Sequence, residues 1–279
     1  MYNALNNENE RTESMALIQN IQSHIEKAEQ SLHSVLRLRA DKLIWDAFYS
    51  GFEYRFCWSS NSLEGNSLSL DETIAVVDFD EVSSGHTYSE YQDAKNLYRA
   101  IRETLRPQPT EITEEWIQKV NGIVLGQEGA YRDENVFIGN AAEAVYYPPM
   151  FEDVPDLMKK HVNAAQELRF KSFADAIVGI AKWHIQFERI HPFRDGNGRT
   201  GRIILNQMLM NNGYLPAAIS HTSKYRQAFR AYDRNQDTSL LIYLICDALE
   251  ESAQLLLSCE KKREMDYAKE RKNREDLSR

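Results

Sequence analysis

The stretch His191-Pro192-Phe193-Arg194-Asp195-Gly196-Asn197-Gly198-Arg199-Thr200-Gly201-Arg202 is the most specific part of this chain. It places a histidine, a carboxylate, a glycine-rich turn and two arginines close together in sequence. A phosphate chain presents clustered negative charge, and each of these residue types can answer part of that charge. The stretch therefore predicts a site for a phosphorylated ligand.

The glycine turn is suited to an anion. Gly196 and Gly198 permit backbone conformations that are closed to other residues, so the turn can point successive N–H groups at one anion. The apolar pattern that resumes at Ile203 predicts a helix starting near Arg199, and the N-terminus of a helix favours an anion as well. Turn and helix would act on the same phosphate group.

The charged side chains supply the other parts of such a site. Arg199 and Arg202 lie three residues apart, so they share one helix face and can present forked donors to further phosphate oxygens. Asp195 offers a hard oxygen ligand suited to Mg²⁺. His191, at the end of the preceding helix, can take a proton from an incoming hydroxyl. The pattern predicts phosphorus chemistry with an activated nucleophile.

The stretch resembles the signature of the Fic family, His-x-Phe-x-(Asp/Glu)-Gly-Asn-Gly-Arg-x-x-Arg, at every defining position. The resemblance implies transfer of AMP from Mg-ATP to a hydroxyl side chain of a target protein, and of the enzyme itself. The death-on-curing branch of the family carries lysine where this chain has Gly198. The glycine therefore favours nucleotidyl transfer.

The resemblance also implies roles for single residues. His191 would be the catalytic base, Asp195 the Mg²⁺ ligand, and Phe193 an anchor of the loop in the core. Asn197 and the glycine backbone would surround the transferred phosphate, with Arg199 and Arg202 on the outer phosphates. The implied nucleotide contacts within the stretch are Asp195, Gly196, Asn197, Gly198, Arg199, Thr200, Gly201 and Arg202.

A second motif lies upstream. Ser60-Asn61-Ser62-Leu63-Glu64-Gly65 resembles the inhibitory helix motif of the family, (Ser/Thr)-x-x-x-Glu-(Gly/Asn). The resemblance implies that Glu64 pairs with Arg202 and displaces the outer phosphate, so that ATP cannot settle in line for attack. Ser60 lies four residues before Glu64 on the same helix face and would help to fix this approach; a plain surface serine is the alternative. Some family members with such a glutamate also remove AMP.

A third resemblance concerns residues 135-149. Asn135–Asn140 and Val145–Pro149 read as two short β runs around a polar turn, similar to the flap hairpin of the family. Ile138, Gly139 and Asn140 would contact the nucleotide, and an exposed strand edge could pair with an extended segment of a target protein. An ordinary structural hairpin is the alternative. Tyr225 stands where the family carries a nucleotide-contacting tyrosine.

Composition describes a globular chain of 279 residues, with 42% hydrophobic and 27% charged residues. The formal net charge of −9 argues against a broad nucleic-acid-binding surface. The N-terminus lacks a signal-peptide pattern and no apolar run could span a membrane, so we expect a cytoplasmic protein. Three cysteines without metal-type spacing are expected to be reduced thiols. The sequence neither predicts nor excludes a homo-oligomer.

The apolar spacing predicts an all-α fold, a Fic-type helical bundle with one short β-hairpin flap. Residues 1 to 13 have no apolar period and are predicted to be disordered. No linker separates domains, so we expect one compact unit. Within it we distinguish an N-terminal helical region with the inhibitory motif (1-70), a catalytic core (71-250) and a charged helical tail (251-279).

Two other functions fit parts of the sequence. His184, Glu188 and His191 lie on one helix face and could bind a transition metal in a metal-dependent hydrolase, although His184 also reads as a core histidine. A nucleotide-binding module held by Glu64 could alternatively serve as a sensor or scaffold without transfer. Metal analysis and incubation with labelled ATP separate these alternatives from the transferase.

Overall fold

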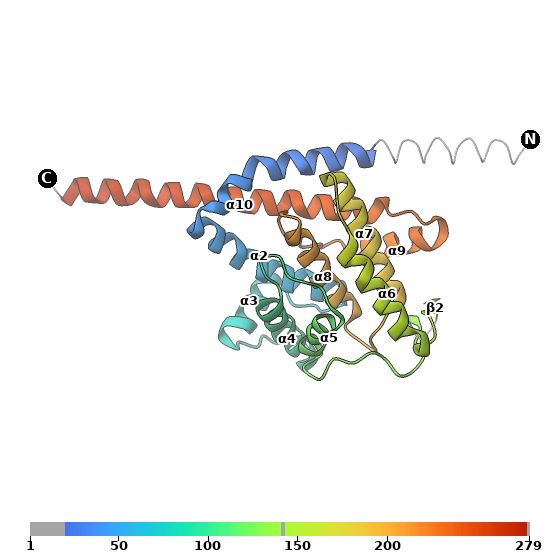
Figure 1. The fold of residues 1–279 in the computed structure, drawn as a ribbon. Coiled ribbons are helices and arrows are strands. Elements are labelled where there is room, and N and C mark those ends of the chain that lie inside the picture. Colours follow the sequence, from blue (N-terminus) through green and yellow to red (C-terminus); the bar gives the residue numbers. More distant parts are fainter. Residues whose placement is uncertain (1–19, 141–142, 278–279) are drawn as a thin grey trace, which may run out of the picture.

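A computed structural model describes residues 20–140 and 143–277 (Figure 1). The segment 1 to 13, predicted to be disordered, lies outside these residues. The described chain is a bundle of helices with one two-stranded hairpin, which confirms the predicted all-α fold with a short β-hairpin flap.

Helices form most of the described chain. Residues 20–35 are helical. They are followed by η1 (Leu36–Ala40), α2 (Lys42–Leu63), α3 (Leu70–Phe79), α4 (Tyr88–Thr104), α5 (Glu114–Leu125), η2 (Phe151–Asp153), α6 (Val154–Glu167), α7 (Phe173–Ile190), α8 (Asn197–Asn211), α9 (Thr222–Asn235) and α10 (Ser239–Leu277).

Local sequence explains where several helices begin. Ser69 and Glu72 form a capping box at α3, and Thr87 and Glu90 form one at α4, so that each pair satisfies backbone N–H groups that the first helical turn leaves free. Ser172 accepts a hydrogen bond from the Asp175 N–H and caps α7. These caps explain why α3, α4 and α7 begin where they do.

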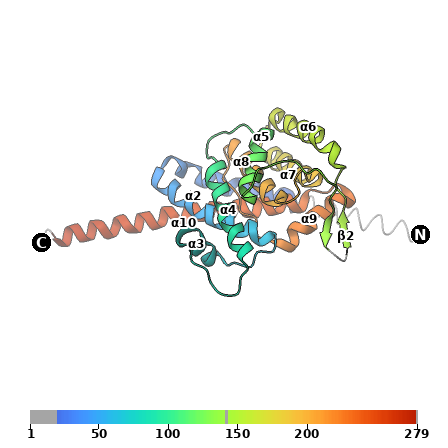
Figure 2. The ribbon, with the colours of Figure 1, turned by 90° about the horizontal axis from the view of Figure 1, so that it is seen from below.

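The core centres on α8, which packs against α2, α5 and α7 (Figures 1 and 2). Nearly every side chain of α8 from Arg199 to Met210 is buried, including both polar and apolar residues. A helix buried on all its faces is a core helix. It starts at Asn197, two residues earlier than the apolar pattern predicts.

The hairpin consists of β1 (Ile138–Asn140) and β2 (Glu143–Tyr146), paired antiparallel with Ile138 opposite Tyr146. It lies at the edge of the molecule beside α9 (Figure 2). Both strands are shorter than the predicted runs, in part because Pro148 and Pro149 cannot donate to a strand ladder.

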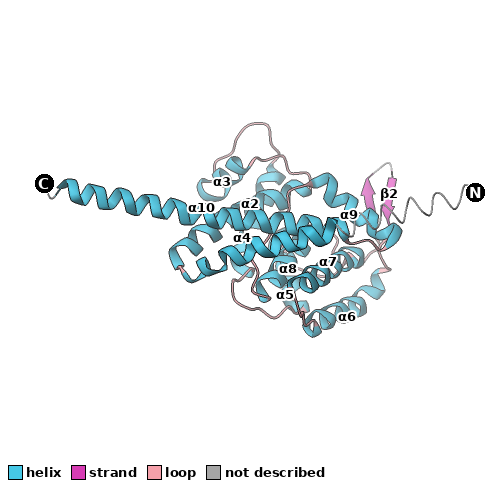
Figure 3. Cartoon of the chain, turned by 90° about the horizontal axis from the view of Figure 1, so that it is seen from above, coloured by secondary structure: helices cyan, strands magenta, loops and turns pink. Residues whose placement is uncertain are grey.

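Helix α10 runs unbroken from Ser239 to Leu277 and extends beyond the body (Figures 1 and 3). Its first half packs in the core, with Leu249 and Leu256 buried, whereas residues 261–271 are almost all exposed. No structural break separates the predicted tail at residue 251 from the core. In the described residues, no helix combines the length and apolar character that a membrane span requires.

Candidate active site

A pocket of about 490 Å³ opens between the end of α2, the hairpin, the end of α7, the start of α8 and α9. It brings together residues that the sequence places up to 167 positions apart. Its lining consists of Leu63, Glu64, Ile138, Gly139, Tyr146, Glu188, Arg189, His191, Gly198, Arg202, Tyr225, Arg226, Phe229 and Arg230.

His191 is the residue at which α7 ends. Its backbone is left-handed (φ 50°, ψ 60°), and its N–H bonds to the Phe187 carbonyl at 3.0 Å. This conformation turns the chain out of the helix and brings the imidazole to the pocket. Burial lowers the pKa of His191 to about 4, so the ring is neutral at neutral pH and can accept a proton.

The loop after His191 is fixed by its own side chains. The Asn197 amide accepts from the Phe193 N–H at 2.9 Å and donates to the Phe193 carbonyl at 2.8 Å, while the Phe193 ring is fully buried. Arg132 binds the loop from outside, through the carbonyls of His191 and Pro192. The Asn197 side chain is thus engaged within the loop rather than facing a phosphate, which differs from the expected role.

Gly196 is the N-cap of α8 and has φ 73°, a conformation that favours glycine. The first turn of a helix leaves N–H groups free, and Gly198 in that turn lines the pocket. Thr200 and Gly201 do not line it. The Thr200 hydroxyl is buried and accepts a hydrogen bond from the Asn121 amide, so this side chain faces the core.

Arg202 is buried beneath the pocket and is held by α2. Its Nη2 donates to Glu64 Oε1 at 2.6 Å and to the Ser60 carbonyl at 2.8 Å, and its Nε donates to the Ser60 hydroxyl at 2.8 Å. The ion pair expected between Glu64 and Arg202 is therefore present. Burial alone would raise the pKa of Glu64, but the charge and hydrogen bond of Arg202 outweigh it and lower that pKa.

Tyr225 and His184 support Arg202 from the other side. The Tyr225 hydroxyl lies 2.7 Å from His184 Nε2 and 3.4 Å from Arg202 Nη1, and the guanidinium lies over the tyrosine ring. His184 Nδ1 lies 3.2 Å from the Gly201 carbonyl, so both ring nitrogens are occupied. Burial lowers the pKa of His184 to about 3, which makes it a neutral core histidine.

The metal site considered for His184, Glu188 and His191 is not formed. Within residues 20–140 and 143–277, no cluster of three histidine, cysteine or acidic side chains is arranged to hold a metal ion. The ring nitrogens of His184 are already hydrogen-bonded. The hydrolase alternative is therefore unsupported.

Arg199 is not among the residues that line the pocket, so its expected contact with the outer phosphates stays a prediction. Its guanidinium is buried and bonds to Asp93 of α4, a residue that the sequence analysis missed. Its Nη2 lies 3.7 Å from Asp195 Oδ1. The Asp195 side chain is 74% exposed beside the loop, and an exposed carboxylate fits a Mg²⁺ that keeps several waters and bridges phosphates.

The outer wall of the pocket comes from the hairpin and α9. Ile138 and Gly139 line it, as expected; the side chain of Asn140 lies outside the described part of the structure. The Arg189 guanidinium lies over the rings of Tyr146 and Phe229 and forms a bidentate ion pair with Asp233. Arg226 and Arg230 on α9 add positive charge that the sequence analysis did not assign.

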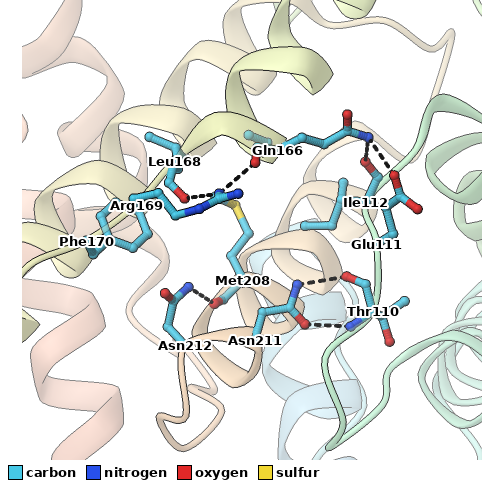
Figure 4. A pocket seen from close by; sticks show the side chains of 11 residues that line it. Thr110, Glu111, Ile112, Gln166, Leu168, Arg169, Phe170, Met208, Asn211 and Asn212 are labelled. Carbon is cyan, nitrogen blue, oxygen red and sulfur yellow. Dashed lines mark hydrogen bonds between the residues drawn. The ribbon is translucent and has the colours of Figure 1, made fainter.

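A second pocket, of about 420 Å³, lies at the C-terminal end of α8 (Figure 4). Its polar side chains bond mainly to backbone groups. The Asn211 amide accepts from the Thr110 N–H and donates to the Thr110 carbonyl. Arg169 donates to the Gln166 and Leu168 carbonyls, and Asn212 donates to the Met208 carbonyl. The Asn211 bonds tie the end of α8 to the segment before α5, and Gln166 at the end of α6 donates to the Ile112 carbonyl of that segment at 3.2 Å. The pocket contains none of the residues predicted for the site.

Comparison with known proteins agrees with the geometry. Residues 111–209 match the model of the Fic/DOC family. A "Protein adenylyltransferase Fic" of Nematostella vectensis is 26% identical over 73% of this chain and 48% of its own length. A probable protein adenylyltransferase of Aquifex aeolicus is 32% identical over 61% of this chain and 52% of its own length. The chain thus spans about half the length of these relatives.

Solved structures show the same fold. A Fic domain containing signaling protein from Bacteroides thetaiotaomicron has a TM-score of 0.71 at 22% identity, covering 86% of this chain and 97% of that one. Fic-1 from C. elegans has a TM-score of 0.68 at 21% identity, covering 91% of this chain and 77% of that one.

Proposed function

We propose that the protein is an adenylyltransferase that transfers AMP from ATP to a hydroxyl side chain of a target protein and of itself, because residues 111–209 match the model of the Fic/DOC family. The curated relatives carry the name of this activity. The observation that carries the proposal is the meeting of a neutral His191 and the first turn of α8 at one pocket.

The residues divide the reaction among them. The His191 ring takes the proton of the incoming hydroxyl as its oxygen forms a bond to the α-phosphorus, and the bond from that phosphorus to the pyrophosphate oxygen breaks. The N–H groups at the start of α8 stabilise the charge on the transferred phosphate. Asp195 would hold a Mg²⁺, whose charge neutralises the phosphates.

Glu64 keeps the enzyme inactive in this proposal. The outer phosphate needs the Arg202 fork, and Glu64 already occupies Nη2 of that fork. The Glu64 side chain is 43% exposed, so it can withdraw toward solvent without disturbing the core. Whether the same carboxylate also positions a water for AMP removal is a separate activity, to be assayed with a modified substrate.

The hairpin is the proposed docking site for the target. In a two-stranded sheet each strand leaves one edge without a strand partner, and an extended target segment can pair with such an edge. Main-chain bonds would then bring the hydroxyl beside His191. The sequence of the target matters less in this mode than its ability to extend.

The test is to incubate the protein with Mg²⁺ and ATP labelled in the α-phosphate, and to identify any adduct on the protein by mass spectrometry. We expect Glu64→Gly to raise self-modification at least tenfold by freeing Arg202 for the outer phosphate. The adduct should be AMP, and His191→Ala in the same background should lose it. Matched controls are Glu128→Gly in an exposed loop and His221→Ala at the start of α9, which should behave like the parent proteins.

Three results would overturn the proposal. A phosphate adduct would indicate a kinase, and nucleotide binding without any adduct in Glu64→Gly would indicate a sensor. Equal labelling of the wild type and Glu64→Gly would remove the inhibitory role of Glu64.

A further inference from the structure

Glu188 is a carboxylate that the proposed reaction does not use. It lies on α7 one turn before His191, lines the pocket and is 7% exposed. Its Oε1 is buried and has no hydrogen-bond partner among the residues that the structure describes. An unpartnered buried carboxylate is unfavourable, so its place in the pocket needs a reason.

The neighbouring helix leaves room for this carboxylate. A Cβ added at Gly201 would lie 2.6 Å from Glu188 Oε1 and 3.1 Å from the His184 ring. Any residue larger than glycine at this position would therefore displace the Glu188 carboxylate. Glycine at position 201 of α8 therefore leaves room for the buried Glu188 carboxylate.

Charged and titratable groups face Glu188 from every packed element. They are Arg202 on α8, Glu64 on α2, Tyr225 on α9, and Arg189, His184 and His191 on or beside α7. Burial raises the pKa of Glu188 to about 7, with Arg202 acting against this shift and Glu64 adding to it. The protonation of Glu188 therefore depends on whether Glu64 is present.

On the basis of the proposed function, we propose that Glu188 is a positioning residue for Arg202. When Glu64 withdraws, Glu188 replaces it as the counter-ion of Arg202. Arg202 is 1% exposed, and a buried guanidinium without a counter-charge is strongly unfavourable. Glu64 can leave toward solvent, but Glu188 is fixed inside α7. Arg202 therefore stays at the pocket in the open state, ready for the outer phosphate.

This exchange moves a proton. When Glu64 leaves, its repulsion of Glu188 ends, the pKa of Glu188 falls, and the carboxyl releases its proton to become the counter-ion. A bound triphosphate restores negative charge beside Arg202, so Glu188 takes a proton up again. Nucleotide binding to the open state is then linked to proton uptake, and the affinity falls as the pH rises.

The test compares Glu64→Gly with Glu64→Gly/Glu188→Gln in the full-length chain. Calorimetric titration with ATP and Mg²⁺, in buffers of different ionisation enthalpy at pH 7, gives the number of protons taken up. Protonation of the nucleotide and of the histidines is common to both proteins and cancels in the difference. We expect a greater proton uptake in Glu64→Gly, and an affinity that falls more steeply with pH in that variant than in the double variant, by up to about tenfold more per pH unit.

Equal proton uptake by the two variants would overturn the inference about Glu188. Failure of Glu64→Gly to bind ATP at all would instead contradict the proposed function. In that case the inference about Glu188 is tested without ATP, by comparing the stability of the wild type with that of Glu188→Gln against pH.

The sign of the unfolding experiment follows from the raised pKa. Glu188 stabilises the fold below its unfolded pKa of about 4.5, and this contribution is lost as the pH rises toward about 7. The stability of the wild type relative to Glu188→Gln should therefore decline over this window. A difference that is constant with pH would show that folding does not raise the pKa of Glu188 and would contradict the proposal.

Discussion

The two sides of the pocket hold their residues by different means. The α2 side consists of Ser60 and Glu64, which meet Arg202 mainly through side-chain atoms, and Glu64 is partly exposed. The loop side runs from His191 to Gly201 and is fixed by left-handed backbone at two positions and by buried hydrogen bonds. One side can exchange partners and the other cannot.

This difference separates catalysis from control. The groups that must meet a phosphorus atom within a fraction of an ångström lie on the rigid side. The carboxylate that must leave lies on the side where departure creates no cavity. Substitutions on the loop side should therefore reduce the free energy of unfolding, whereas those on the α2 side should act mainly on Arg202.

Asn197→Ala gives the largest effect on stability that we expect. It removes two buried hydrogen bonds and leaves the N–H and carbonyl of Phe193 unsatisfied, which costs about 3 kcal/mol in total. Urea unfolding measures the loss. Asn212→Ala is the matched control, because Asn212 is exposed at a helix end and its amide donates only to the Met208 carbonyl. A loss as small as that of the control would mean that the loop is not fixed by Asn197.

Gly201→Ala should cost about 2 kcal/mol, because overpacking a buried site forces neighbours to move. The added methyl would meet Glu188, Phe187 and His184, all inside the core. In Gly51→Ala, the matched control within α2, the methyl makes ordinary contact with Leu255 at 3.7 Å and should leave stability unchanged or higher. If thermal unfolding shows the two variants to be equally stable, the loop side accommodates an added methyl group as readily as the α2 side.

Sequence predicts this molecule best where local patterns carry the information. The apolar period predicts α7 from Phe173 to Ile190 with the observed bounds, and Ser69 followed by acidic residues marks the start of α3. The pairing of Glu64 with Arg202 can be predicted from the sequence because each residue belongs to a motif with a recognisable pattern, although the two motifs lie far apart in the chain.

The rest depends on packing between distant segments. Asp93 lies 106 residues from Arg199, and no pattern in α4 distinguishes it from other exposed acids. The Asn197 amide could equally have faced a ligand, and only the folded loop shows it bound to Phe193. Arg226 and Arg230 reach the pocket because of how α9 lies against the hairpin, which the helical period alone does not determine.

Ser60→Ala should give the smallest loss of stability among these predictions. It also allows the closest comparison, because Ser59→Ala changes the adjacent serine of the same helix. Both hydroxyls are buried in α2, but Ser59 bonds only to the carbonyl of Phe56 in its own helix, whereas Ser60 accepts from Arg202 Nε. Loss of the Ser60 hydroxyl leaves a buried charged donor without its acceptor and should cost about 1 kcal/mol, while Ser59→Ala should stay within about 0.5 kcal/mol of the wild type. Chemical unfolding of the two variants measures the difference. If they are equally stable, Ser60 does not hold Arg202, and Glu64 is the only side chain of the α2 side that controls it.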